Sequence, residues 1–245
     1  MRALGRIIEI WRYPVSSMGG ERLEESPLDA RGIEHDRIWG VIERENGEVA
    51  APEKRKHWRP LPNLFSRMVA AEPDVGKGDG TWYPVSSPQA QDLATRFLGF
   101  PAALRPHTAY GTESEGKVAP RYERADIHLL TTASMRMLAS LLPDPAEVDR
   151  RRFRPSIVVD TVPGLEGFVE HEIVGKKLAV GNATITISEP CARCSFTALA
   201  QGNLSFEPAV LHKISQHGKG GFGVLCKIET PAVIRVGDAV TLVEA

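Results

Sequence analysis

The segment with the clearest chemical potential is residues 188–197, which read S-E-P-C-A-R-C-S-F-T. It places two thiols, Cys191 and Cys194, on either side of Arg193, directly after a strand-like run. Pro190 is expected to end that strand and to stiffen the turn. A neighbouring cation makes a thiol easier to deprotonate, and the thiolate is the form that binds metals or attacks electrophiles. This loop is therefore the best candidate for chemistry.

Four interpretations of the loop are open on the residues alone. A structural zinc site needs four ligands, so His212, His217 or Cys226 would have to complete the single C-x-x-C motif. A thioredoxin-like site needs the motif to open a helix, whereas the residues after Cys194 resemble a strand. The loop could also hold two inert cysteines in a turn. The fourth interpretation is one thiolate bound to a soft transition metal, with arginines holding an anionic organic cofactor.

Arginines precede two of the predicted strands. Four arginines within residues 150–154 lead directly into the apolar run 156–160, which places them at a sheet edge. Arg37 stands at the start of a predicted strand, either in a surface ion pair with Asp36 or facing a ligand. Because a guanidinium fork matches the oxygens of phosphate and carboxylate, both places are candidate anion sites.

Two small polar segments lie where a backbone could approach a ligand. Residues 16–20, S-S-M-G-G, follow the first predicted strand and form either a plain turn or a ligand-binding loop. Residues 131–134, T-T-A-S, join a short predicted strand to a predicted helix. The amino end of such a helix suits an anion, but helix capping explains these hydroxyl groups equally well.

Composition limits the class of protein. The chain has 245 residues, a net charge of -1, 42% hydrophobic and 25% charged residues, which is ordinary for a globular protein with a substantial core. The near-neutral charge gives no support for a nucleic-acid partner or an anionic membrane surface. Three cysteines do not make a disulfide scaffold, so we expect a reducing, cytoplasmic setting. We expect no membrane span, since no apolar run approaches the required length.

The pattern of strands and helices predicts a mainly β protein with a few short helices. Many runs rich in β-branched residues are separated by turn signals, and three short helices are expected after Ser87, after Ser134 and near Pro208. These helices do not alternate with the strands in a βαβ pattern. A β-barrel or a folded sheet is therefore favoured over a dinucleotide-binding α/β fold. Residues 105–124 read as a long loop between two halves.

Several segments in order resemble a known family. They are Y-P-V-S-S-M-G-G from residue 13, G-I-E-H-D-R-I-W-G-V-I from 32, R-R-F-R-P-S-I-V-V-D from 151, E-P-C-A-R-C-S-F-T-A-L from 189, G-F-G-V from 221 and I-R-V-G-D-A-V from 234. Together they are similar to MOSC-domain proteins, the domain named for the C-terminal part of molybdenum-cofactor sulfurase, over nearly the whole chain. The resemblance implies a MOSC-type β-barrel core at 105–245 and an N-terminal β-barrel-like subdomain at 1–104.

The group that the chain most resembles is the molybdenum enzymes that reduce N-hydroxylated compounds, such as the mitochondrial amidoxime-reducing component. This resemblance implies a molybdenum cofactor (molybdopterin), with Cys194 as its metal ligand and catalytic residue. Arg193 is expected to favour the thiolate. The implied cofactor-binding residues are Ser16, Ser17, Arg37, Thr132, Ser134, Arg154 and Ser156. Relatives commonly have Lys at the position of Ser16 and Asn at that of Ser156, so this chain lacks one charge and one amide there.

The resemblance implies an oxidoreductase that acts on N-oxygenated small molecules. Electrons are expected from a separate partner protein, because the sequence has neither a ferredoxin-type cysteine run nor a dinucleotide fingerprint. A second hypothesis is a carrier module that binds the cofactor or a persulfide without turnover, and a third is a barrel with a vestigial site. His107, His128 and His171 are isolated and receive no role, and Cys226 is expected to be a small core residue.

Overall fold

A closed barrel forms the larger part of the molecule. The computed structural model describes residues 2–123 and 126–243. One sheet has the strand order β11-β10-β14-β13-β12-β16-β1-β2, and β11 also pairs with β1, so that seven of these strands close on themselves. The strands are β1 (Arg2–Arg12), β2 (Glu21–Leu23), β10 (Ile127–Thr131), β11 (Ile157–Thr161), β12 (Lys177–Val180), β13 (Ala183–Ala192), β14 (Gly221–Thr230) and β16 (Ala239–Val243).

Apolar side chains at alternating positions of the strands fill the barrel. Successive side chains of a strand point to opposite faces, so Ile185 and Ile187 of β13 share the inner face and are fully buried. The same core contains Ile7 and Ile10 of β1, Ile157 of β11 and further apolar side chains from the other strands. The fold class predicted from the sequence, mainly β with a barrel core, is confirmed.

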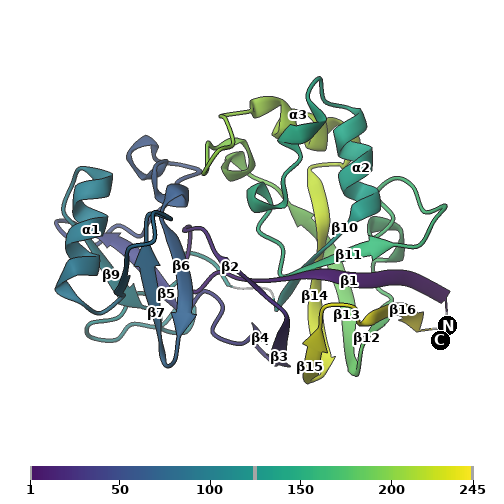
Figure 1. The fold of residues 1–245 in the computed structure, drawn as a ribbon, viewed down its shortest axis with the longest axis horizontal. Helices are drawn as coiled ribbons and strands as arrows, with labels where there is room; N and C mark the ends of the chain where they lie inside the picture. Colours follow the sequence, from purple (N-terminus) through teal and green to yellow (C-terminus); the bar gives the residue numbers. More distant parts are fainter. Residues whose placement is uncertain (1, 124–125, 244–245) are drawn as a thin grey trace.

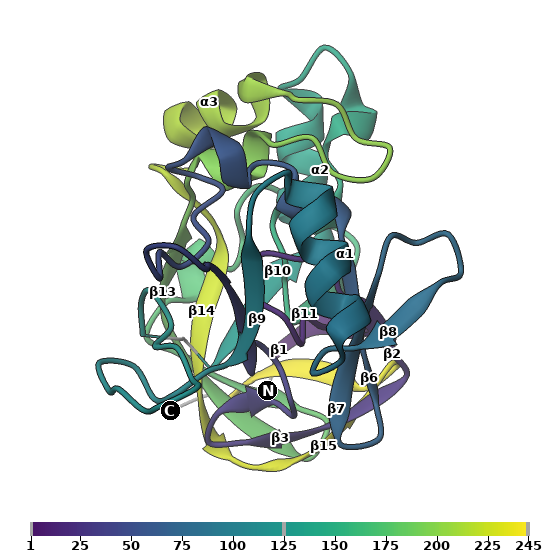
Figure 2. The same cartoon turned by 90° about the vertical axis from the view of Figure 1, so that its left-hand side faces the viewer.

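The remaining strands form smaller sheets beside the barrel (Figure 1). These are β5 (Trp39–Glu43) with β9 (Ala102–Pro106), β6 (Phe65–Val69) with β7 (Glu72–Gly76) and β8 (Trp82–Pro84), and β3 (Glu25–Asp29) with β4 (Gly32–Ile33) and β15 (Ala232–Arg235). Helix α1 (Pro88–Leu98) packs beside β9, β8 and β7, as Figure 2 shows. Its ends follow the sequence: the Ser87 hydroxyl accepts a hydrogen bond from the Ala90 amide, and Gly99 closes the helix at φ +81°.

The two halves of the chain share strands. β1 belongs to the barrel, where it pairs with β11 and β16, although it lies within the first 104 residues. β15, near the carboxyl end, pairs with β3. The division into 1–104 and 105–245 stays a prediction, and both halves contribute to the barrel core.

A helical layer covers one end of the barrel. It contains α2 (Thr132–Ser140), α3 (Pro208–His217) and the short 3-10 helices η3 (Pro145–Glu147), η4 (Arg150–Arg152), η5 (His171–Ile173) and η6 (Ser195–Ala198). Two more 3-10 turns, η1 (Lys56–Trp58) and η2 (Leu61–Asn63), belong to the other half. Apolar side chains of α2 and α3 pack with Phe153 and Phe222. Among the described helices, none is both long and apolar enough to cross a membrane.

Two local expectations were wrong. Pro190 does not end its strand, because β13 continues to Ala192, and register shifts on both sides of Pro190 accommodate a residue without an amide hydrogen. The residues after Cys194 form η6 rather than a strand. Cys226 is 1% exposed, as expected of a core cysteine.

Candidate functional site

The loop after β13 holds two thiols in different surroundings. Cys194 is exposed and is the residue before η6, where its side chain makes no capping hydrogen bond. Cys191 is half-buried, and both cysteines are free. The next residue, Ser195, donates its hydroxyl to the carbonyl of Glu53 at 2.7 Å, which fixes the loop against the other half of the chain. The loop therefore presents one accessible thiol beside the junction of the two halves.

The Arg193 side chain is hydrogen-bonded to Cys191 rather than to Cys194. Its Nη1 is 3.0 Å from the Cys191 Sγ, and its Nη2 donates to the Phe153 carbonyl at 2.9 Å. Burial raises the pKa of the Cys191 thiol, but the charges and hydrogen bonds of His128 and Arg193 outweigh it and lower this pKa to about 6. Arg193 therefore stabilises the thiolate of Cys191, the first cysteine of the C-x-x-C motif.

Two arginines meet around one buried tyrosine. The Arg154 guanidinium carbon is 4.1 Å from the centre of the Tyr13 ring, and that of Arg37 is 5.1 Å from it. Arg37 donates to the Arg154 carbonyl and pairs with Asp36. Arg154 donates through Nη1 to the Met18 carbonyl, while its Nη2 is buried without a hydrogen-bond partner. Burial and the nearby charge of Arg37 lower the pKa of Arg154 to about 10.

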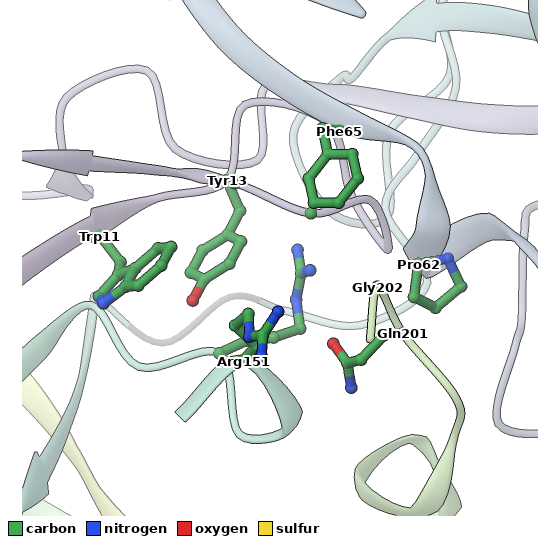
Figure 3. A pocket seen from close by; sticks show the side chains of 10 residues that line it. Trp11, Tyr13, Pro62, Phe65, Arg151, Gln201 and Gly202 are labelled. Carbon is green, nitrogen blue, oxygen red and sulfur yellow. The ribbon is translucent and has the colours of Figure 1, made fainter. Parts of the chain in front are cut away.

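A cavity of about 120 Å³ lies next to Arg154, between the first strand region and the loops near residues 62 and 202 (Figure 3). It is lined by Trp11, Tyr13, Gly19, Gly20, Pro62, Phe65, Arg151, Arg154, Gln201 and Gly202. Three lining side chains have a buried polar atom without a partner: the Tyr13 hydroxyl, Arg154 Nη2 and Gln201 Nε2. Each of these groups can donate a hydrogen bond, so the cavity is suited to the oxygens of an anion.

The small residues of the cavity wall are required by packing. A Cβ atom on Gly19 would lie 2.5 Å from the Phe65 ring, and one on Gly20 would lie 2.2 Å from the Arg12 carbonyl oxygen. The backbone of the segment 16–20 thus lies directly against its neighbours. The anion-binding expectation for this segment gains a structural basis, because Met18 contacts Arg154 and Gly19 and Gly20 line the cavity.

Two of the predicted serines, Ser16 and Ser156, have hydrogen-bond partners within the chain. Ser16 Oγ is 3.0 Å from His107 Nε2. Ser17 has a left-handed backbone, at φ +67°. Ser156 is 3% exposed, and its hydroxyl accepts the backbone amide of His128 at 3.2 Å. This hydrogen bond therefore links the residue before β11 to β10.

Thr132 and Ser134 lie at the other end of β11 from Arg154. The Thr132 hydroxyl donates to Asp160 at 2.8 Å, near the carboxyl end of that strand. Ser134 is fully buried and donates to Glu170 at 2.7 Å. The structure brings Arg37, Arg154 and the segment 16–20 together but leaves these two hydroxyl groups apart from them.

Three side chains near this site were given no role from the sequence: Tyr13, His128 and Gln201. Arg151, which also lines the cavity, belongs to the arginine run that was expected at an anion site. His128 carried a signal, since it is a polar residue inside the apolar strand β10, and it is only 7% exposed. Tyr13 and Gln201 carried none, because their role depends on segments far away in the chain. Around the two loop cysteines, the described residues contain no cluster of three or more metal-type ligands; Glu43, Glu48 and His57 form such a cluster in the other half.

Comparisons with known proteins agree with this architecture. Residues 4–117 match the MOSC N-terminal beta barrel domain, and residues 109–241 match the MOSC domain. The chain is 25% identical to a molybdenum cofactor sulfurase of Drosophila grimshawi over 253 residues, covering 89% of the chain and 31% of that relative. It is 23% identical to molybdenum cofactor sulfurase 3 of Aedes aegypti over 261 residues, covering 88% and 32%.

The chain spans about a third of the length of these curated relatives. Among solved structures, the YUAD protein from Bacillus subtilis superimposes with a TM-score of 0.53 at 12% identity, covering 99% of this chain and 97% of that one. This likeness concerns the fold alone. The two matched regions together extend from residue 4 to residue 241, and the chain belongs to the MOSC-domain family, with a MOSC N-terminal beta barrel domain ahead of the MOSC domain.

Proposed function

We propose that the chain binds the molybdenum cofactor at the junction of its two halves and acts as an oxidoreductase. The observation that carries the proposal is the set of buried donors without partners, on Tyr13, Arg154 and Gln201, around one cavity. Arg154 also lies 5.5 Å from the centre of the Phe196 ring, two residues after Cys194. Buried polar groups are normally paired, so donors left unpaired indicate a missing acceptor. Membership of the MOSC-domain family supports the choice of cofactor.

The residues present fit an anionic group that also carries a soft metal. Arg154 and Arg37 supply positive charge, and the exposed thiol of Cys194 is a suitable ligand for molybdenum. The segment that contains Ser16 and Ser17 lies beside Arg154, which donates to the Met18 carbonyl. Ser156, two residues after Arg154, belongs to the proposed binding set, although its hydroxyl is bonded within the chain. Thr132 and Ser134 were expected in the same set, but their hydroxyl groups are bonded at the other end of β11, and the cavity proposed here does not include them. When bound, the cofactor supplies the oxygen-atom and electron chemistry.

The proposed substrates are small N-oxygenated compounds, and the proposed electron donor is a separate protein in the cytoplasm. The exposure of Cys194 supports this assignment, because substrate and donor must both reach the metal that this thiol would hold. The chain's own contribution would be to position the cofactor, to balance its charge through Arg37 and Arg154, and to hold the metal with a thiol that is itself exposed.

Metal analysis tests the proposal. The protein is purified from a host that makes molybdopterin, beside Cys194→Ser and a matched control, Cys191→Ser. We expect about one molybdenum atom per chain in the wild type and in Cys191→Ser, and none in Cys194→Ser with its thermal unfolding unchanged. Wild-type protein should then reduce an N-hydroxylated test substrate with an artificial electron donor. Molybdenum retained in Cys194→Ser would reject the ligand assignment.

A second candidate function is supported by a separate observation. The curated relatives are named molybdenum cofactor sulfurases, and the loop contains a second thiol besides the proposed ligand. A carrier of cofactor or sulfur would bind the cofactor reversibly and show no turnover with any artificial donor. The turnover assay therefore separates the two candidates.

A further inference from the structure

A serine and a histidine from distant parts of the chain meet beside the start of β5. Ser16 Oγ is 3.0 Å from His107 Nε2, and His107 Nδ1 is 3.0 Å from the Val118 carbonyl oxygen. Because a carbonyl only accepts, Nδ1 carries the hydrogen of the neutral ring, and Nε2 is left as the acceptor. The Ser16 hydroxyl therefore donates to His107. The three groups have the order of a nucleophile, a base and a group that orients the base.

The backbone holds these two residues at this separation. The Ser16 amide donates to the Trp39 carbonyl at 2.8 Å. The His107 amide donates to the Ile38 carbonyl, also at 2.8 Å. A Cβ atom on Gly40 of β5 would lie 2.5 Å from His107 Cε1, so the ring occupies the place of the missing side chain. Both partners are thus anchored on the start of the same strand, although they are 91 positions apart in the chain.

The residue after the serine has a free amide. Ser17 is the third residue of a turn in which the Met18 amide donates to the Val15 carbonyl at 3.3 Å, and its backbone is left-handed at φ +67°. In the part of the chain that the structure describes, no group accepts a hydrogen bond from the Ser17 amide. In α/β-hydrolases, the amide directly after the nucleophilic serine is one of the donors that stabilise the oxyanion of acyl transfer. A hydrogen bond that only joined two segments would not need this donor.

The imidazole is suited to act as a base. Burial lowers the pKa of His107, and the hydrogen bond to Val118 opposes this effect without cancelling it. The ring is therefore neutral at pH 7 and can take up a proton. Ser16 and His107 are both half-buried, so neither side chain is closed off from solvent. A neutral base and an accessible hydroxyl are what nucleophilic catalysis by serine requires.

We propose that Ser16 and His107 form a catalytic pair that hydrolyses carboxylic esters with a small acyl group. Ser16 Oγ attacks the ester carbonyl carbon, a C–O bond forms on the serine, and the hydroxyl proton passes to His107 Nε2. The ester C–O bond then breaks, and the alkoxide takes that proton and leaves as an alcohol. Water attacks the acyl-serine in the same way. Its proton passes through Nε2 to the serine oxygen, and the carboxylic acid is released, so no oxidant, reductant or cofactor is needed.

The chemistry of the pair favours esters over amides. A histidine of lowered pKa is a weak base, and the Ser17 amide supplies one oxyanion donor where α/β-hydrolases use two. An ester carbonyl is more easily attacked than an amide carbonyl, and an alkoxide leaves more readily than an amine. We therefore expect acyl transfer from reactive esters and no cleavage of peptides. Since both side chains are half-buried, a short acyl group fits better than a long one.

The experiment uses the full chain produced without molybdopterin, at pH 7, with a fluorophosphonate and p-nitrophenyl acetate as probes. The thiols of Cys191 and Cys194 also react with acetyl esters, so they are first blocked with iodoacetamide, and peptide mapping by mass spectrometry assigns each adduct. We expect the fluorophosphonate adduct at Ser16 in folded wild type and not in the urea-unfolded chain. Steady release of p-nitrophenolate should be lost in Ser16→Ala.

Two substitutions give the comparison. His107→Gln should lower the rate of fluorophosphonate labelling at Ser16 by roughly 100-fold or more, because it removes the base and keeps the serine. Ser140→Ala is the matched control. It removes a surface hydroxyl that donates to the Met137 carbonyl, and it should be labelled at Ser16 as fast as wild type. Thermal unfolding of each variant shows whether a lost rate reflects a lost fold.

Two results would overturn the inference. One is folded wild type without an adduct at Ser16, which requires no substitution, and the other is a folded His107→Gln that is labelled as fast as wild type. Ser16 also belongs to the proposed cofactor-binding set, so the molybdenum content of the same variants from a molybdopterin-producing host reports on that proposal separately. Normal molybdenum without labelling at Ser16 would leave the cofactor site in place and reject the catalytic pair.

Discussion

Two arginines, the buried Arg152 and the half-buried Arg154, should respond to the same substitution with opposite sign. Arg152 is 0% exposed, and its guanidinium pairs with Glu147 and donates to the carbonyls of Glu147, Thr197, Leu199 and Ser205. Arg154 has one buried nitrogen without a partner and lies near a second cation, Arg37. We expect Arg152→Met to destabilise the cofactor-free protein and Arg154→Met to stabilise it.

The lowered pKa of Arg154 gives the size of the stabilisation expected for Arg154→Met. A fall from 12.5 to about 10 corresponds to a cost of about 3 kcal/mol for holding the cation in the folded chain. The folded pKa lies below the unfolded value, and both lie above 7, so this cost is fully present at pH 7 and is relieved only as pH rises through about 10. Loss of the contact with Tyr13 and of the bond to Met18 offsets roughly 1–2 kcal/mol. The net gain for Arg154→Met is about 1–2 kcal/mol.

Urea and thermal unfolding of the cofactor-free variants check this prediction. A gain of 1 kcal/mol should raise Tm by roughly 2–4 °C in a chain of this size. Arg152→Met should lower stability by about 3–5 kcal/mol, because it leaves the half-buried Glu147 without its cation and the carbonyls of Thr197, Leu199 and Ser205 without their donor. In a molybdopterin-producing host, Arg154→Met should lose most of its molybdenum in spite of its higher Tm. The reasoning is refuted if Arg154→Met is destabilised as much as Arg152→Met.

Three further substitutions test other contacts. Burial lowers the pKa of His107, so the unfolded chain binds its proton more readily and stability falls as pH drops below about 6.5. The urea midpoint of wild type should therefore fall relative to that of His107→Gln from pH 7 to pH 5. Ser134→Ala removes a hydroxyl donor from the buried Glu170 and should cost about 1–3 kcal/mol in urea unfolding. Gly223→Ala must strain a left-handed backbone and displace His128, and thermal unfolding should show a loss of about 2 kcal/mol or more. Unchanged unfolding in either of the last two would contradict the packing described.

Local rules predicted the ends of helices and the class of the fold. Ser87 and Gly99 bound α1 as their chemistry requires, since a hydroxyl can accept an amide and glycine tolerates a positive φ. The same kind of rule was wrong for Pro190. Proline cannot donate a ladder hydrogen bond, but the shifts of register at 187–189 and 190–192 place it where β13 still pairs with β14. Such shifts depend on the partner strand, which local sequence does not specify.

The sequence predicted only part of the site, because here too the partners of a residue lie far away in the chain. The arginines and cysteines were identified because their chemistry is visible in the residue type. Their partners were not: Arg154 bonds to Met18 across 136 positions, and His128 reaches Phe222 across 94. Arg193 was expected to favour the thiolate of the ligand cysteine, but the fold directs its Nη1 to Cys191. Which of two neighbouring thiols receives a charge is decided by the path of the backbone, not by spacing along the chain.

Arg37 and Arg154 share one more property that bears on function. Both have left-handed backbones, at φ +51° and +53°, a conformation that costs about 1–3 kcal/mol for a residue with a side chain. Surrounding contacts hold this geometry, including the Tyr13 amide on Asp36 at 2.7 Å and the Arg37 bond to the Arg154 carbonyl. Around Arg37 and Arg154, backbone strain, an unpaired buried donor and two adjacent cations all lower the stability of the ligand-free fold. An anion that pairs with these donors binds only the folded state, so its binding should stabilise the protein most where the free chain is least favourable.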